Sequence, residues 1–94
     1  MQISRLYFYM SKCDKLLEKA KNSINNFSFD EICQLAECYG FQFQRQSSSH
    51  VIYEHPALSI EQNRLLNFQN FKGKAKPYQV RQLLKAISFL SDER

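Results

Sequence analysis

The stretch GFQFQRQSSSHVIYEHP, residues 40–56, decides the fold, because its apolar residues change from helical to strand spacing. Phenylalanines alternate with polar residues over residues 41–45, which is typical of a half-buried strand. A serine-rich turn is expected at residues 47–48, and residues 50–54 are rich in β-branched and aromatic side chains, which favour a second strand. Pro56 ends this strand, because proline has no N–H to donate to a sheet. The stretch therefore predicts an antiparallel hairpin.

Two helices are predicted before the hairpin. Residues 11–22 carry one apolar stripe behind a serine that can cap the helix. Ser28 and Glu31 have the spacing of a capping box and begin a second helix. Gly40 ends that helix, since glycine adopts a left-handed conformation without strain. The apolar segment 3–10 is ambiguous between a short strand and a helical start.

A third strand and a closing helix are predicted after the hairpin. Residues 65–71 place Leu66 and Phe68 on one face of a strand. A basic turn follows at residues 72–76, and Pro77 fits the first position of the last helix.

This order of elements defines the fold class that we expect. An α–α–β–β–β–α chain is typical of an α+β sandwich, in which a three-stranded antiparallel sheet carries helices on one face. The expected division is an N-terminal extension with one helix, residues 1–26, followed by the main domain, residues 27–94. At 94 residues, with 44% hydrophobic and 23% charged residues, the chain has the size and composition of one globular domain.

Composition also predicts a cytoplasmic protein that does not contact a membrane. No run approaches the roughly 18 apolar residues of a spanning helix, and segment 3–10 makes a poor signal peptide. The three cysteines, Cys13, Cys33 and Cys38, are odd in number and form no CxxC pair. We expect three free thiols in a reducing compartment. The spacing of the histidines, cysteines and acids matches no metal site, so no metal is predicted.

The charge is uneven along the chain. Thirteen Lys and Arg against nine Asp and Glu give a net charge of +4. Residues 63–91 contain no acid but several basic residues: Arg64, Lys72, Lys74, Lys76, Arg81 and Lys85. Such a patch attracts polyanions, among them nucleic acids. The alternative is a solvated surface that keeps the protein soluble. Tyr78, beside the basic turn, could stack on a base.

The two histidines are the candidate acid–base groups. His50 and His55 are five residues apart, which on a strand separates them by about 16 Å and points them to opposite faces. At most one of them can therefore be catalytic within one chain. With a turn at residues 47–48, Arg45 would face His50 across the ladder, at the end of the apolar face. A nearby cation disfavours protonation and keeps the imidazole available as a base. The alternative is that His50 is simply a polar strand end.

The hairpin and the basic turn together resemble one known family. Residues 40–41, 45–46, 48–53 and 55–56 look like the signature of HicA toxins, from type II toxin–antitoxin systems. The stretch KGKAKPYQVRQ, residues 72–82, resembles a longer-chain subgroup of that family. The resemblance covers about residues 27–90. It implies a double-stranded-RNA-binding-like fold, which agrees with the order of elements expected above.

The resemblance also implies an activity and partners. The family cleaves mRNA independently of the ribosome, which arrests growth, and a HicB-type antitoxin covers the active site. The family's essential histidine maps onto His50. Chemistry and resemblance together predict an endoribonuclease without metal or cofactor, in which His50 takes the proton from a ribose 2′-OH. The RNA contacts expected beside it are Arg45, Ser48, Ser49, Lys72, Lys74, Lys76, Tyr78 and Arg81.

One residue departs from the family pattern. Ser48 stands where the family usually has glycine, which permits a positive φ and a close approach to phosphate. Two alternatives therefore remain open. The chain could be a non-catalytic RNA-binding module, or an inactive HicA-like protein that binds a HicB-type partner.

Overall fold

The computed structural model describes residues 10–92. Nearly all of segment 3–10 lies outside these residues. The predicted order of elements is confirmed. In chain order they are α2 (Lys12–Asn22), the short 3-10 helix η1 (Ile24–Asn26), α3 (Phe29–Cys38), β1 (Gln42–Ser47), β2 (His50–Glu54), the 3-10 helix η2 (Ile60–Gln62), β3 (Leu65–Gln69) and α4 (Pro77–Asp92).

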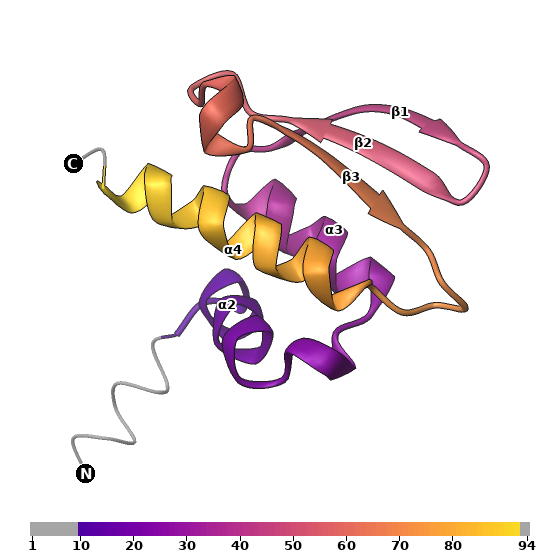
Figure 1. Ribbon diagram of the computed structural model, residues 1–94. Coiled ribbons are helices and arrows are strands. Elements are labelled where there is room, and N and C mark those ends of the chain that lie inside the picture. Colours follow the sequence, from indigo (N-terminus) through magenta and orange to yellow (C-terminus); the bar gives the residue numbers. More distant parts are fainter. Residues whose placement is uncertain (1–9, 93–94) are drawn as a thin grey trace, which may run out of the picture.

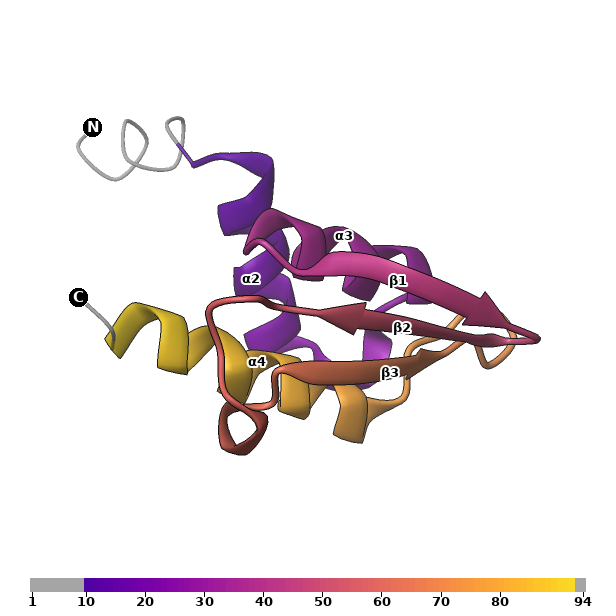
Figure 2. The same cartoon turned by 90° about the horizontal axis from the view of Figure 1, so that it is seen from above.

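The three strands form one antiparallel sheet in the order β1-β2-β3. Helices α3 and α4 cover one face of this sheet, and α2 packs on their far side (Figure 1). Figure 2 shows the molecule from the sheet side: the strands lie in front of the helices, and no element of residues 10–92 covers them. The expected α+β sandwich with helices on one face is therefore confirmed, with α2 added outside it.

The hydrophobic core lies between the sheet and the α3–α4 pair. Residues alternate between the two faces of each strand, so every second residue of β2 and β3 points into the core. The expectation that Leu66 and Phe68 lie on the same face of their strand is confirmed, and both side chains are buried. The largest fully buried side chains are Phe27, Ile32, Leu35, Phe68, Val80 and Leu83. The opposite side of the sheet, called the outer face below, carries His50, Ile52, Glu54, Leu65, Asn67 and Gln69.

The two helices predicted before the hairpin begin with the expected caps. The Ser11 side chain accepts a hydrogen bond from the Asp14 N–H at 3.1 Å. The Ser28 side chain accepts one from the Glu31 N–H at 3.0 Å, and the Glu31 carboxylate accepts from the Ser28 N–H in return. These reciprocal bonds satisfy N–H groups that the helix itself cannot pair.

Gly40 ends α3 against a buried histidine. Its φ is +92°, and a Cβ built on it would lie 2.9 Å from His55 Nε2. The His55 ring is paired on both sides: Nε2 lies 2.9 Å from the Tyr39 carbonyl oxygen, and Nδ1 accepts from the Ala57 N–H at 3.1 Å. The ring also packs edge-on against Phe41. His55 is thus a structural histidine, held inside the protein by contacts on both ring nitrogens.

Replacing Gly40 by alanine should destabilise the protein by about 2–3 kcal/mol. The left-handed backbone costs an L-residue about 1–2 kcal/mol, and displacing the His55–Tyr39 hydrogen bond adds about 1 kcal/mol. Urea unfolding of Gly40→Ala beside wild type measures this difference. Gly73, which also has positive φ but has no heavy atom within 4 Å of a built Cβ, provides the control. Gly73→Ala should cost less, and equal losses at both glycines would contradict the crowding by His55.

The prediction of three free thiols is wrong. Cys13 and Cys38 form a disulfide with their Cα atoms 5.7 Å apart, and Cys33 alone is free. The prediction compared cysteines along single helices, whereas this pair joins the start of α2 to the end of α3. Helices α2 and α3 pack against each other, which brings those ends together. The bond ties the N-terminal helix to the main domain.

None of the helices within residues 10–92 has the length and apolar character needed to cross a membrane.

Candidate functional site

The hairpin turn lies one residue later than expected. Ser48 and Ser49 form the turn, and Ser47 pairs with His50. Moving the turn by one residue changes each cross-strand partner by two. Arg45 therefore pairs with Ile52, and the predicted pairing of Arg45 with His50 is wrong. Both side chains still lie on the same face, as diagonal neighbours within reach of a long side chain.

A bulge in β1 separates Arg45 from the core. The register shifts between Phe43 and Arg45, so Gln44 is an extra residue in the ladder. Phe43 consequently faces Tyr53, and their rings pack edge-on with centroids 6.0 Å apart. Arg45 faces outward beside Ile52. The expectation that His50 and Arg45 lie at the end of the apolar face is therefore also wrong, since both lie on the outer face.

His50 begins β2 and is half-buried on the outer face. Its Nδ1 atom lies 2.9 Å from Oδ1 of Asn67, which projects from the adjacent strand. Its direct partners in the ladder are Ser47 and Gln69. Within residues 10–92, its other ring nitrogen has no hydrogen-bond partner in the protein. The histidine thus presents one ring nitrogen to the solvent side of an open sheet.

The basic turn begins at the His50 end of the sheet. Gln69, the partner of His50, ends β3, and the next residue, Asn70, donates its N–H to the Ser49 carbonyl oxygen at 2.8 Å. Phe71 and Lys74 then pair with each other across Lys72 and Gly73, which both have positive φ. This conformation is a tight reversal of the type that needs left-handed residues at both centres.

The reversal is anchored to the start of α3. The Phe29 N–H donates to the Gly73 carbonyl oxygen at 3.0 Å, and the Ala75 N–H donates to the Phe27 carbonyl oxygen at 3.0 Å. The Phe71 side chain lies at the surface of this reversal and is half exposed. The Lys76 Nζ atom lies 4.8 Å from the centroid of the Phe71 ring. The lysines of this turn are therefore presented by a fixed backbone.

The expected RNA contacts fall into three groups. Arg45, Ser48, Ser49 and His50 belong to the hairpin, and Lys72, Lys74 and Lys76 belong to the adjoining turn. Tyr78 and Arg81 are exposed but lie on α4, under the sheet rather than on its outer face. None of the basic side chains in these groups forms an ion pair with another of residues 10–92. Arg64 differs, because its Nε lies 2.8 Å from the Glu54 carboxylate.

Two residues of this region were not predicted from the sequence. Asn67 contacts His50, and Gln79 is 3% exposed, with its Oε1 accepting from the Gln69 N–H at 2.8 Å. Gln79 thereby ties the end of β3 to the first turn of α4. The alternation of residues in β3 places Asn67 on the outward side, which was the available signal. Its contact with His50, however, depends on how β3 aligns with β2, and the sequence did not define that alignment.

The clear pKa shifts lie away from the outer face. Burial raises the pKa of the Tyr53 hydroxyl, and its 2.6 Å hydrogen bond to the Glu37 carboxylate raises it further. Burial also raises the pKa of the Cys33 thiol to about 11, so this cysteine is a thiol and a poor nucleophile at neutral pH. Neither group is a candidate for chemistry.

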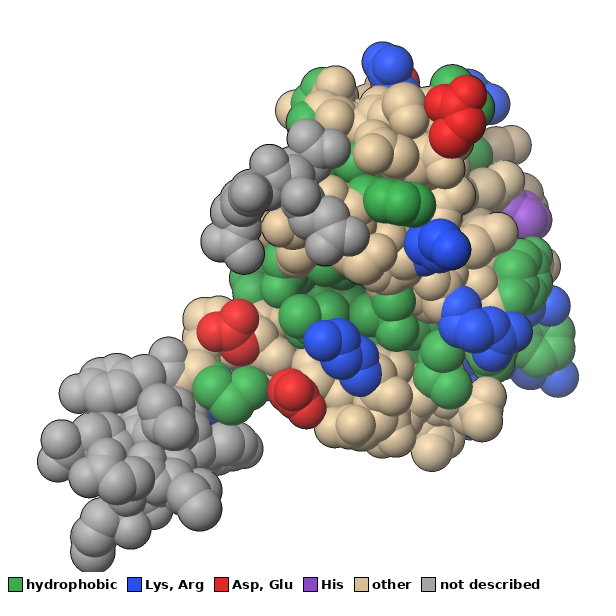
Figure 3. Space-filling view, turned by 60° about the vertical axis from the view of Figure 1, so that its left-hand side comes forward, with side chains coloured by type: hydrophobic (Ala, Val, Ile, Leu, Met, Phe, Trp, Pro, Cys, Tyr) green, Lys and Arg blue, Asp and Glu red, His purple; other side chains and the backbone are tan. Residues whose placement is uncertain are grey.

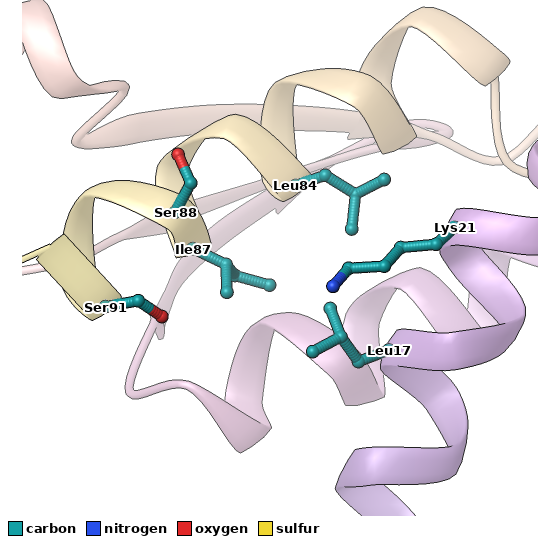
Figure 4. A pocket seen from close by; sticks show the side chains of 6 residues that line it. All are labelled: Leu17, Lys21, Leu84, Ile87, Ser88 and Ser91. Carbon is teal, nitrogen blue, oxygen red and sulfur yellow. The ribbon is translucent and has the colours of Figure 1, made fainter.

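A hollow between α2 and α4 is a second candidate site. Figure 3 shows hydrophobic side chains gathered in a band on one side of the molecule, with basic side chains along it. The hollow has a volume of about 190 Å³ and lies on the far side of the helix layer from His50. Its lining is mainly aliphatic and offers one charged group, an amine: Leu17, Lys21, Leu84, Ile87, Ser88 and Ser91 (Figure 4). It therefore lacks an acid–base pair. Within residues 10–92, no three His, Cys, Asp or Glu side chains are grouped to hold a metal.

The fold and the open face define a small α-β-β-β-α protein with one half-buried histidine on its outer face, beside a basic turn. A family model described as "HicA toxin of bacterial toxin-antitoxin" matches residues 29–88, well over half of the chain. The chain therefore belongs to the HicA toxin family, and the resemblance seen in its sequence is confirmed. It is a toxin of a toxin–antitoxin system, in which an antitoxin is the partner. No curated protein and no solved structure matches it.

The substitution Ser48→Gly should stabilise the protein. Ser48 has φ +55°, in the left-handed region, where relief of strain gains about 1–2 kcal/mol. The greater freedom of glycine in the unfolded chain offsets about 0.5–1 kcal/mol of this gain. We expect a net increase of about 0.5–1 kcal/mol in the free energy of unfolding, measured by urea titration. Ser49→Gly at the neighbouring turn position, which lacks a positive φ, is the control, and no gain from Ser48→Gly would show that the turn holds serine without strain.

Proposed function

We propose that this toxin is an endoribonuclease that cleaves mRNA without a metal ion, with His50 as the general base. The observation that carries the proposal is the location of His50 on an uncovered sheet face, next to the turn with Lys72, Lys74 and Lys76. The histidine can accept a proton, and the cations can bind the phosphates on either side of the scissile bond. The match to the HicA family supports this reading.

The reaction proposed is transesterification within the RNA strand. His50 removes the proton from a ribose 2′-OH, and the resulting oxygen attacks the adjacent phosphorus. The bond from phosphorus to the 5′-oxygen breaks, and that oxygen takes up a proton from solvent or from protonated His50. The products are a 2′,3′-cyclic phosphate and a 5′-hydroxyl. Arg45 and the lysines of the turn stabilise the charge that develops on the phosphoryl oxygens.

The substrate and partner follow from the same surface. An open, uncovered sheet face suits a strand of RNA better than a small molecule, which binds in a concave pocket. The antitoxin proposed is a HicB-type protein that covers the outer face and so blocks access to His50. Tyr78 and Arg81 would extend the contact with RNA along α4. We also propose that residues 1–26 form an extension to the main domain, residues 27–94.

The test is cleavage by the purified chain in the presence of EDTA. Incubation with mRNA should produce fragments whose 5′ ends carry hydroxyl groups and whose 3′ ends carry cyclic phosphates. Induced expression should stop growth, and co-expression of the HicB-type protein from the same operon should restore it. Intact RNA at high enzyme concentration, together with unaffected growth, would contradict the proposal.

The second candidate is a module that binds RNA without cleaving it. The observation that favours it is Ser48, which holds a left-handed conformation at the position where the family usually has glycine. The Ser48 side chain and the strained backbone at this residue could keep the phosphate of the RNA away from His50. This candidate predicts that the chain binds RNA with an affinity that falls steeply as salt increases, and leaves the RNA intact. An inactive toxin that retains its partner would bind the antitoxin but not RNA.

A further inference from the structure

We propose that Asn67 is a positioning residue, which holds His50 with its proton on Nδ1 and so leaves Nε2 free to accept a proton. The inference rests on the proposed function of His50 as the general base, and it names the group that prepares His50 for that role.

The geometry of the sheet brings the two side chains together. Asn67 pairs with Ile52, two residues along β2 from His50, so both project from the outer face as diagonal neighbours. The distance between His50 Nδ1 and Asn67 Oδ1 is 2.9 Å, which is ideal for a hydrogen bond. Gln69 lies directly across from His50, yet its side chain makes no hydrogen bond with any of residues 10–92. The contact therefore belongs to Asn67 in particular.

The chemistry of the amide decides which nitrogen carries the proton. An amide oxygen can only accept a hydrogen bond, so the Nδ1 atom facing it must be the donor. A neutral ring with its proton on Nδ1 has a lone pair on Nε2. Nε2 has no protein partner among residues 10–92 and lies on the uncovered face. The atom available to a ribose hydroxyl is therefore the one that can act as a base.

The second histidine shows the opposite arrangement. His55 Nδ1 accepts from the Ala57 N–H, so its proton must lie on Nε2, which donates to the Tyr39 carbonyl oxygen. Both of its nitrogens are occupied, as expected of a structural histidine. His50 has one nitrogen fixed and one free, which is the pattern of a catalytic base held by an orienting group.

The location of Asn67 in the fold also points to a role beyond structure. Asparagine is depleted in strands, yet Asn67 is the central residue of β3. Its side chain is exposed, so it fills no space in the core. A neutral amide also orients the imidazole without adding a negative charge, which would favour the protonated ring.

The first test measures the tautomer of His50 directly. Long-range proton–nitrogen NMR spectra of the labelled chain, which has two histidines, distinguish the Nδ1–H form from the Nε2–H form. We expect the Nδ1–H form for His50 and the Nε2–H form for His55, which serves as the internal reference. In Asn67→Leu, His50 should shift toward the Nε2–H form while His55 stays unchanged. A wild-type His50 in the Nε2–H form would overturn the inference.

The second test measures cleavage of RNA by matched variants. Asn67→Leu should reduce the rate constant of cleavage by about 10–100-fold, as loss of an orienting group typically does. Asn67→Asp keeps the oxygen acceptor and should restore most of this rate, with an optimum at higher pH because the carboxylate favours the protonated ring. Gln69→Leu makes the same type of change on the same face and should retain the wild-type rate and tautomer.

The outcomes separate this inference from the proposed function. If Asn67→Leu cleaves at the wild-type rate while His50→Ala is inactive, His50 is the base and Asn67 does not position it. If His50→Ala also cleaves at the wild-type rate, the proposed function itself fails. Equal losses in Asn67→Leu and Asn67→Asp would show that the acceptor oxygen is not what matters, which also overturns the inference.

Discussion

Replacing His50 by alanine should reduce the rate constant of RNA cleavage by about 10²–10⁴-fold, the contribution typical of a general base. Without the imidazole, the ribose 2′-OH must lose its proton to water, and its oxygen attacks phosphorus more slowly. Binding should change little, because Lys72, Lys74, Lys76 and Arg45 remain in place. The measurement is single-turnover cleavage of a labelled RNA, with affinity measured separately at the same salt concentration.

The stability of the variant should remain close to that of wild type. His50 is half-buried, and its side-chain hydrogen bond is to Asn67, which is exposed. Loss of one such bond costs about 0.5–1.5 kcal/mol. The matched control is Ser47→Ala, which changes the direct cross-strand partner of His50 and leaves the imidazole in place. Both variants should fold, and Ser47→Ala alone should retain activity. If His50→Ala cleaves as fast as wild type, the base is another residue.

The sequence was sufficient to predict the elements of the fold because their signals are local. The capping serines Ser11 and Ser28, the terminating Gly40 and the leading Pro77 each act within a few residues of the chain. The change from helical to alternating spacing after Gly40 likewise depends on near neighbours. Packing of the helices on one face followed from the order of elements, since an antiparallel sheet can leave its other face in water.

The register of the hairpin could not be predicted from the same signals. Three consecutive serines, Ser47, Ser48 and Ser49, offer two turns of equal local quality. The bulge at Gln44 and the hydrogen bond from Asn70 to Ser49 favour the later turn, and both depend on neighbouring strands. A change of one residue in the turn moved Arg45 from opposite His50 to a diagonal position. Asn67 was missed because its contact with His50 depends on a second register, the pairing of β3 with β2, which local patterns do not define either.

The basic turn was predicted as a segment, but its shape was not. Its lysines stand out in the sequence as a run of one sign of charge. The left-handed backbone at Lys72 depends on the paired reversal between Phe71 and Lys74 and on anchoring at Phe29. The anchoring contact joins Phe29 to Gly73, which are more than 40 residues apart, beyond what local patterns describe. The charge of the candidate site was therefore readable from the sequence, whereas its geometry was not.

Removing the disulfide between Cys13 and Cys38 should reduce the free energy of unfolding by about 3.5 kcal/mol. The bond closes a loop of 25 residues, and the chain-entropy relation for a loop of that length gives this value. Helix α2 should remain in place after reduction, because Leu16 and Ala20 stay buried in the core. We therefore expect a folded but less stable protein. The measurement is urea unfolding of wild type and Cys13→Ser, each with and without reductant.

The reductant provides the internal comparison for this prediction. Wild type should lose stability when reduced, whereas Cys13→Ser should be insensitive to reductant and match reduced wild type. Cys33→Ala is the control, because Cys33 is the free thiol and its replacement should leave the response to reductant intact. Thiol titration of the unfolded, unreduced chain should detect one free cysteine in wild type. Three free thiols, or equal unfolding midpoints with and without reductant, would contradict the disulfide. Cleavage of RNA should persist in the reduced protein, because the bond lies beyond the helix layer from His50 and the outer face does not depend on it.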